Sequence, residues 1–191
     1  MTSSPLERAL NVHHSVFIQA CAGAGKTFAL TKRYAAILDS FAAEARRGAD
    51  PGDIDPGRIL VITFTKKAAG EMASRIYQDT GILLSGREIP EMRAQGIDHC
   101  PVLRKDSHPA VREYARYLRE SFSRHAIATI DAFCAKVLRE FAHRSGLDPQ
   151  FTVQEEADAA QLLETYLDRW IGQTAGRREP VLTHAFGGNT G

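Results

Sequence analysis

The sequence predicts an α/β fold in which a parallel β-sheet carries helices on both faces. Three units of a strand followed by a helix support this prediction, over residues 15–46, 58–79 and 126–144. Strands that alternate with helices pair in parallel, because each helix carries the chain back along the sheet. Such sheets bind ligands beyond the carboxyl ends of their strands. The residues that follow each strand are therefore the first candidates for a functional site.

The first unit starts with a short apolar run, Ser15 to Ala20, that a glycine-rich turn closes. A run of this length and character is typical of a buried strand. From Thr27 to about Arg46, apolar residues recur at steps of three and four, which is the pattern of an amphipathic helix. A strand, a loop and a helix are thus predicted in direct succession.

The second unit contains the strongest strand signal of the chain, the apolar run from Arg58 to Phe64. Its continuous apolar character favours a central parallel strand. A helix is predicted next, from Thr65 to Asp79, with the Thr65 hydroxyl as its N-cap. The third unit joins a short strand, residues 126–130, to a helix that Gly146 ends.

The remaining segments set the domain organisation. Residues 81–110 mix glycine, proline and charged residues without a period, so we interpret them as an irregular surface insertion. Helices are expected over residues 111–123 and 155–171. We therefore divide the chain into a first domain, residues 1–145, and the start of a mostly helical subdomain, residues 146–191.

Composition limits the class of protein. With 43% hydrophobic and 25% charged residues, the chain has the make-up of a soluble globular protein, and no apolar run approaches the roughly 20 residues of a membrane span. The N-terminus lacks a secretory signal, and the cysteines Cys21, Cys100 and Cys134 form no CxxC pair. We expect a cytoplasmic protein with free thiols and no membrane partner. A formal net charge of +1 neither supports nor excludes nucleic acid.

The loop after the first strand matches the phosphate-binding pattern GxxxxGK[ST], with alanine in place of the first glycine. Gly23 and Gly25 permit backbone angles that turn amide N–H groups onto phosphate oxygens. Lys26 brings a positive charge to the β- and γ-phosphates, and Thr27 opens the helix and offers its hydroxyl to Mg²⁺. We predict ATP and Mg²⁺ as cofactors, with Lys26 and Thr27 as catalytic residues. The predicted cofactor-binding loop is Ala20, Cys21, Ala22, Gly23, Ala24, Gly25, Lys26 and Thr27.

This loop alone leaves the kind of work open, because kinases, GTPases, transporters and helicases share it. One alternative is a motor enzyme that moves along DNA. A second is a module that binds ATP and single-stranded DNA without turnover. A third, a small-molecule kinase, would need Asp131 as its metal carboxylate and leaves residues 63–72 unexplained.

Four ordered segments, spread over roughly residues 8–165, resemble the UvrD-like helicases of superfamily 1, and most closely their RecB and AddA branch. The second segment, ILVITFTKKAAGEM, is similar to motif Ia of these helicases almost residue for residue. The third carries Asp131 where many members have histidine. The segments are residues 16–33, 59–72, 128–134 and 146–153.

The resemblance implies a P-loop NTPase fold with a RecA-like sheet and the activity of an ATP-dependent DNA helicase. It further implies 3′ to 5′ tracking along single-stranded DNA in recombination and repair. Single-stranded and double-stranded DNA would be the substrates, and a second helicase–nuclease subunit would be a partner.

Individual residues take roles from the same resemblance. Arg33 is implied to approach the nucleotide, although a solvated arginine on a helix face fits its position as well. An aromatic ring at a strand end can stack on a base of any sequence, while hydroxyls hold phosphates. The alternatives are a core ring for Phe64 and Phe133 and a helix cap for Thr129. The implied DNA-binding residues are Phe64, Thr65, Lys66, Thr129 and Phe133.

Several parts of such an enzyme are missing from the sequence. The ATPase needs a strand that ends in Asp-Glu, and later arginines that stabilise the transferring phosphoryl group. Asp131 is followed by Ala132, and Glu155-Glu156 lacks a preceding apolar strand. An adenine-reading glutamine has no clean equivalent either. The resemblance places the catalytic parts beyond residue 191, so we expect an N-terminal fragment that is inactive alone.

A group of basic residues in the second half of the first domain allows two interpretations. They can form a stripe that faces DNA, or a solvated helix face. The group consists of Arg104, Lys105, Arg112, Arg116, Arg119 and Arg124.

Overall fold

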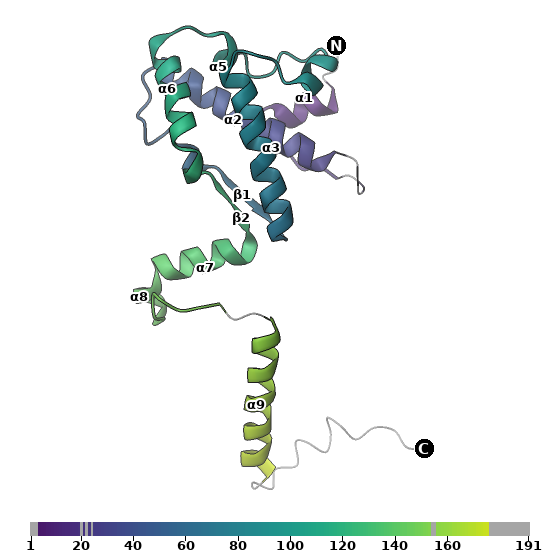
Figure 1. Ribbon diagram of the computed structural model, residues 1–191, viewed down its shortest axis with the longest axis vertical. Coiled ribbons are helices and arrows are strands. Elements are labelled where there is room, and N and C mark those ends of the chain that lie inside the picture. Colours follow the sequence, from purple (N-terminus) through teal and green to yellow (C-terminus); the bar gives the residue numbers. More distant parts are fainter. Residues whose placement is uncertain (1–3, 20, 22, 24, 154–155, 176–191) are drawn as a thin grey trace. The chain divides into compact units, whose positions relative to one another are not determined.

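The computed structural model describes residues 4–19, 21, 23, 25–153 and 156–175, and it separates into two compact units (Figure 1). The units comprise residues 1–134 and 135–191. In the first unit the described residues form α1 (Pro5–Leu10), α2 (Lys26–Arg46), η1 (Pro56–Arg58), β1 (Leu60–Thr63), α3 (Lys66–Leu84), α4 (Pro90–Ala94), α5 (Pro101–Lys105), α6 (Pro109–Glu120), η2 (Phe122–Arg124) and β2 (Ala126–Thr129). Helix α7 (Ile130–Glu140) spans the boundary, and α8 (Ala142–Ser145) and α9 (Glu156–Ala175) belong to the second unit.

The sheet of the first unit consists, within the described residues, of β1 and β2 in parallel. Leu60 lies opposite Ala126, and Thr63 lies opposite Thr129. The crossover between the strands contains α3 and α6, as the alternation of strand and helix signals predicts. The α/β class is therefore confirmed, with a small sheet in a helix-rich unit.

The predicted first strand is wrong for the residues that the structure describes. Residues 15–19 form no strand, and the Phe17 ring is 89% exposed; Ala20 lies outside the described residues. An apolar run signals burial, but a strand forms only where a neighbour satisfies its N–H and C=O groups. The described residues provide no such neighbour, so a full RecA-like sheet is not observed.

The helices agree better with their sequence signals. Helix α2 begins at Lys26, one residue before the predicted start, and ends at the predicted Arg46. Helix α3 continues beyond Asp79 to Leu84. The helix expected over residues 131–144 is divided into α7 and α8, and Gly146 takes the left-handed conformation with φ of 68° that suits a C-cap.

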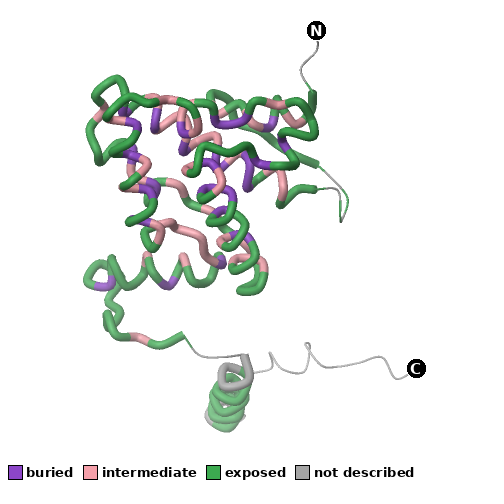
Figure 2. Tube along the Cα trace, turned by 45° about the horizontal axis from the view of Figure 1, so that its top comes forward, coloured by how far each residue is buried: buried purple, intermediate pink, exposed green. Residues whose placement is uncertain are grey.

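The core of the first unit lies where α2, α3 and α6 meet, in the buried segments of Figure 2. Leu38, Ile76 and Leu118 are among its fully buried side chains. A second cluster includes Leu83, Ile89 and Met92, which come from the predicted surface insertion or border it. That insertion is therefore packed into the unit rather than an excursion, with the prolines that open α4 and α5 giving its helices their first turns.

No helix within the described segments combines the length and the apolar character that a bilayer crossing requires.

Candidate functional site

The phosphate-binding loop has the backbone that its sequence predicts at the described positions. Gly23 and Gly25 have φ of 79° and 83°, a region that side chains other than glycine rarely adopt. Gly25 is the N-cap of α2, so Lys26 and Thr27 occupy its first turn. Ala20, Ala22 and Ala24 lie outside the described residues.

The first turn of α2 is suited to an anion. It contains no acidic residue, and the N–H groups of a helix start carry a partial positive charge. Lys26 donates from Nζ to the carbonyl oxygen of Cys21 at 2.7 Å, so its ammonium reaches back across the loop. Thr27 is exposed beside it. The described residues therefore place a cation and a hydroxyl-bearing residue at a helix start, the combination typical of a magnesium–triphosphate site.

Arg33 has a contact set that sequence reasoning did not foresee. Its guanidinium donates to the carbonyl oxygens of Ala9 at 2.7 Å, Asn11 at 2.8 Å and His14 at 2.7 Å. The side chain thereby fastens the segment before the loop to the second turn of α2. Its approach to a nucleotide stays a prediction.

The end of β1 exposes the residues implied to contact DNA. The Phe64 ring is 89% exposed and therefore is not a core ring of this unit. Thr65 is the N-cap of α3 and accepts a hydrogen bond from the Ala68 N–H at 3.1 Å. Lys66 follows as the first, exposed residue of α3. An aromatic face, a helix start and a cation thus lie together at the carboxyl end of the strand.

Thr129 ends β2 beside Thr63, so its position adjoins the same sheet edge. Its side chain is buried, and its hydroxyl accepts from the Ala132 N–H at 3.2 Å, as a helix cap does. Phe133 is half-buried one turn into α7, while Asp131 is exposed. The structure therefore brings Phe64, Thr65 and Thr129 to one edge, with the Thr129 hydroxyl already engaged.

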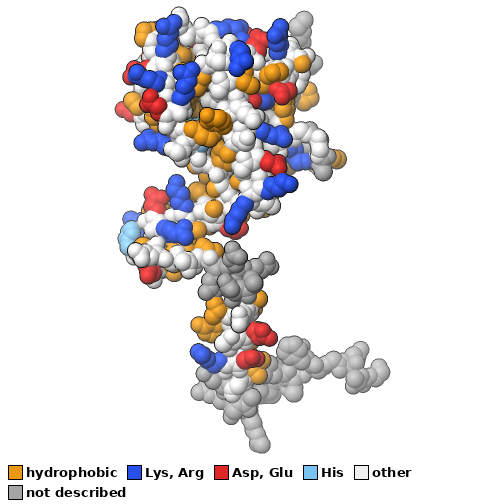
Figure 3. Space-filling model, viewed as in Figure 1, with side chains coloured by type: hydrophobic (Ala, Val, Ile, Leu, Met, Phe, Trp, Pro, Cys, Tyr) orange, Lys and Arg blue, Asp and Glu red, His pale blue; other side chains and the backbone are white. Residues whose placement is uncertain are grey.

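The basic group does not form a free stripe. Figure 3 shows cationic and anionic side chains interspersed over the face of the first unit that it draws. Arg119 donates to the Leu84 carbonyl oxygen, and four others lie in ion pairs. The pairs are Arg104 with Glu88 and Asp98, Lys105 with Asp98, Arg116 with Glu113, and Arg124 with Asp55. This neutralisation favours the solvated-face interpretation for Lys105, Arg116 and Arg124, which are exposed. The Arg104 side chain is only 5% exposed and fits neither interpretation.

A buried ion pair of the first unit was not foreseen from the sequence. Lys32 Nζ contacts both carboxylate oxygens of Asp79, at 2.8 and 2.7 Å, and the two side chains are only 5% and 10% exposed. Burial raises the pKa of Asp79, while the Lys32 ammonium opposes that shift. The pair joins α2 to α3. Its partners are 47 residues apart, so no local spacing reveals it.

A family model described as the UvrD/REP helicase N-terminal domain matches residues 1–182. The chain belongs to the UvrD/REP helicase family. This confirms the resemblance drawn from the four segments, and it removes the small-molecule kinase as an alternative. The phosphate loop and every candidate DNA-binding residue of this helicase chain lie within the matched region.

Relatives point to one branch of the helicase family. The chain is 31% identical over 183 residues to an ATP-dependent helicase/nuclease subunit of Natranaerobius thermophilus, covering 94% of this chain and 12% of that protein. It is 35% identical over 151 residues to the protein of the same name from Pelotomaculum thermopropionicum, covering 78% of this chain and 9% of that protein. It is 31% identical over 165 residues to the protein of the same name from Geobacillus kaustophilus, covering 85% of this chain and 10% of that protein. The helicase chain thus spans about a tenth of these relatives' length.

Proposed function

We propose that this chain is the ATP-binding N-terminal region of a DNA helicase that tracks single-stranded DNA from 3′ to 5′ in recombination and repair. The family match over residues 1–182 carries the helicase part of this proposal. Its ATP-binding part rests on a loop with two left-handed glycines, which places Lys26 and Thr27 in the acid-free first turn of α2. We place the activity in the cytoplasm, where the three free cysteines would stay reduced.

In this proposal the loop amides, Lys26 and the start of α2 hold the phosphates of ATP, and Thr27 supplies one ligand to Mg²⁺. Bound Mg²⁺ would neutralise phosphate charge and help to orient the terminal phosphoryl group. Before that, the Lys26 ammonium must leave the Cys21 carbonyl oxygen. Arg33 acts from a distance in this scheme, because its donors already hold three backbone carbonyls of the preceding segment.

Single-stranded DNA would lie along the edge where β1 and β2 end. The exposed Phe64 ring offers a stacking face, and Thr65 and Lys66 offer a hydroxyl and a positive charge to the backbone. Double-stranded DNA and a second helicase–nuclease subunit complete the proposed partners. The relatives are named as one subunit of a helicase/nuclease, which supports the existence of another.

A second candidate function is a module that binds ATP and single-stranded DNA without turnover. No second acidic motif follows a strand in the sequence, and Asp131 stands alone and exposed at the start of α7. This observation favours binding without hydrolysis for the 191-residue chain itself.

The deciding experiment measures binding of a fluorescent ATP analogue and ATP hydrolysis, with and without single-stranded DNA, beside a Lys26→Ala variant. We expect weak, Mg²⁺-dependent binding that the variant loses, and no hydrolysis. Equal binding by the variant would contradict the phosphate-site proposal. Hydrolysis that rises with DNA would instead show that Asp131 or Glu156 supplies the missing carboxylate.

The DNA edge is tested with Phe64→Ala. Loss of one stacked base should weaken binding of a short thymidine oligonucleotide by about 5- to 150-fold, on the scale of 1–3 kcal/mol per stacked base. Phe17→Ala is the matched control, because Phe17 is equally exposed but precedes the phosphate loop. An equal effect of both substitutions would count against the proposed edge.

A further inference from the structure

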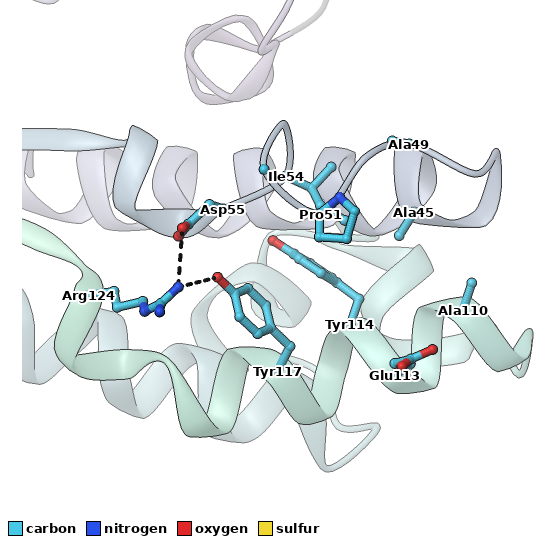
Figure 4. Close-up of a pocket in the computed structure, with 11 residues that line it drawn as sticks. Ala45, Ala49, Pro51, Ile54, Asp55, Ala110, Glu113, Tyr114, Tyr117 and Arg124 are labelled. Carbon is cyan, nitrogen blue, oxygen red and sulfur yellow. Dashed lines mark hydrogen bonds and ion pairs between the residues drawn. The ribbon is translucent and has the colours of Figure 1, made fainter.

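A pocket of about 420 Å³ opens in the first unit between the end of α2 and helix α6 (Figure 4). Ala45, Pro51 and Ile54 form one wall, and Ala110 and Tyr114 of α6 form the other. The volume falls within the range of small-molecule sites, and the lining is predominantly apolar.

The pocket is separate from the nucleotide site and from the proposed DNA edge. Ala45 lies near the end of α2, roughly 28 Å along the helix from Lys26 at a rise of 1.5 Å per residue. The pocket is also lined by residues from 49–55, which precede β1, and by Arg124, which precedes β2. They therefore lie toward the amino ends of the strands, away from Phe64.

Tyr114 provides the observation that points to a ligand. Its side chain is only 3% exposed, and its hydroxyl has no hydrogen-bond partner in the described part of the chain. Figure 4 shows this hydroxyl extending between the two walls, toward Pro51 and Ile54. Burial keeps the pKa of Tyr114 above its usual range, so the group retains its proton and can donate. The neighbouring Tyr34, by contrast, is paired with His125 Nδ1 at 2.9 Å.

The polar end of the pocket disfavours an anionic ligand. Arg124 Nη1 lies 3.3 Å from the Tyr117 hydroxyl and 3.5 Å from an Asp55 carboxylate oxygen. Glu113, also in the lining, adds a second carboxylate. The positive charge of Arg124 is therefore matched or exceeded within the lining, and a carboxylate or phosphate would gain no net attraction.

We propose that this pocket binds an uncharged aromatic compound that carries a carbonyl acceptor. The ring packs against the alanine, proline and isoleucine wall, and the carbonyl oxygen accepts the hydrogen bond that Tyr114 has free to give. Desolvating an unsatisfied buried donor is costly, so pairing it favours a ligand with an acceptor over a hydrocarbon of the same size.

Benzamide is a suitable probe, and benzoate is its anionic match. Backbone amide shifts of the isotope-labelled full chain are followed by NMR during titration. We expect benzamide to shift pocket residues with a dissociation constant on the order of 1 mM, as a compound of this size allows. Benzoate should bind at least tenfold more weakly, and binding of the ATP analogue should not change.

Tyr114→Phe retains the ring and removes the donor, so benzamide affinity should fall about fivefold, the loss of one neutral hydrogen bond. Ala110→Leu, which fills the cavity, should abolish binding. Tyr166→Phe, an exposed tyrosine of the second unit, is the matched control and should change nothing. Three results would each overturn the proposal. They are the absence of shifts at tens of millimolar benzamide, equal binding of benzoate, and unchanged benzamide affinity in a folded Tyr114→Phe variant. The first of these results would mean that the pocket holds only water.

Discussion

Lys32 and Asp79 show how a single pair of residues can fix two elements. Both side chains lie almost entirely out of solvent, and Lys32 also lies 5.1 Å from the centre of the Phe28 ring. Such a pair contributes little net stability, because removing both charges from water costs about as much as their attraction returns. Its value lies in geometry, since only one relative placement of α2 and α3 satisfies both groups.

We predict that Lys32→Met lowers the free energy of unfolding by about 3–5 kcal/mol, because it leaves the Asp79 carboxylate buried without a partner. The double variant Lys32→Met/Asp79→Leu should regain most of that loss. Urea denaturation checks both values. Lys105→Met, which breaks the solvent-exposed pair with Asp98, should have little effect. A double variant as unstable as the single one would contradict this account.

Asp39 predicts a dependence on pH. Burial raises its pKa to about 6, despite a hydrogen bond that its carboxylate accepts from the Leu103 N–H at 2.7 Å. The folded state therefore holds this proton more tightly than the unfolded state does. Stability from this group is present below about pH 4 and is lost as the pH rises to about 6.

Asp39→Asn isolates that contribution. Relative to the unchanged protein, the variant should become more stable as the pH rises from 4 to 6, by at most about 1.4 kcal/mol per pH unit. Denaturation midpoints at several pH values measure the difference. His99, whose pKa burial lowers to about 4, acts in the opposite direction within the same window, so the difference between variants is the informative quantity.

At this scale the sequence is informative where one short motif carries the chemistry. The left-handed backbone of the predicted phosphate loop could be anticipated, because Gly23, Gly25 and Lys26 lie within four residues and form one local pattern. Lys32 and Asp79 were not predictable, since a lysine or an aspartate on a helix resembles any solvated residue until its distant partner is known. The hydrogen bonds from Arg33 to three backbone carbonyls could not be predicted for the same reason.

Among the helices and strands, too, the locally encoded features agree with the sequence prediction and the features that depend on distant partners do not. Helix α2 was predicted to within a residue, because its periodicity and its glycine start are both local. Of the strand predicted over residues 15–20, the described residues 15–19 form none, because strand formation depends on a neighbour that the run itself does not specify. The insertion proved to be packed, with Ile89 and Met92 buried. Its helices α4 and α5 have only five residues each, too few for an apolar period to show in the sequence.

The clamp between Arg33 and the segment after α1 yields a prediction about these elements. Arg33→Lys keeps the charge but loses the fork that reaches three carbonyls. We expect faster hydrogen exchange over residues 9–14 and binding of the ATP analogue weakened by a few fold. Arg47→Lys, at the exposed end of α2, is the control and should alter neither. Unchanged exchange in Arg33→Lys would mean that the segment is held by other contacts.

For the whole molecule, the chain covers only a small share of its relatives, and the acidic motif of the ATPase is absent from its sequence. Without that motif the chain lacks the acidic residues that would hold Mg²⁺ and position water for hydrolysis. We therefore predict that the purified 191-residue chain does not separate a partially single-stranded duplex. A fluorescence strand-displacement assay measures this, and detectable unwinding would refute it.

The packing of α2 against α3 has a thermodynamic consequence. Helix α2 starts at the phosphate loop and α3 starts at the exposed edge of β1, while Leu38, Met72 and Ile76 share one core between them. Under the proposed function, a nucleotide that shifts the start of α2 would act on the same core that holds α3. Any change that ATP makes in the affinity for DNA is then matched by an equal change that DNA makes in the affinity for ATP. If both bind as proposed, each ligand is an effector of the other.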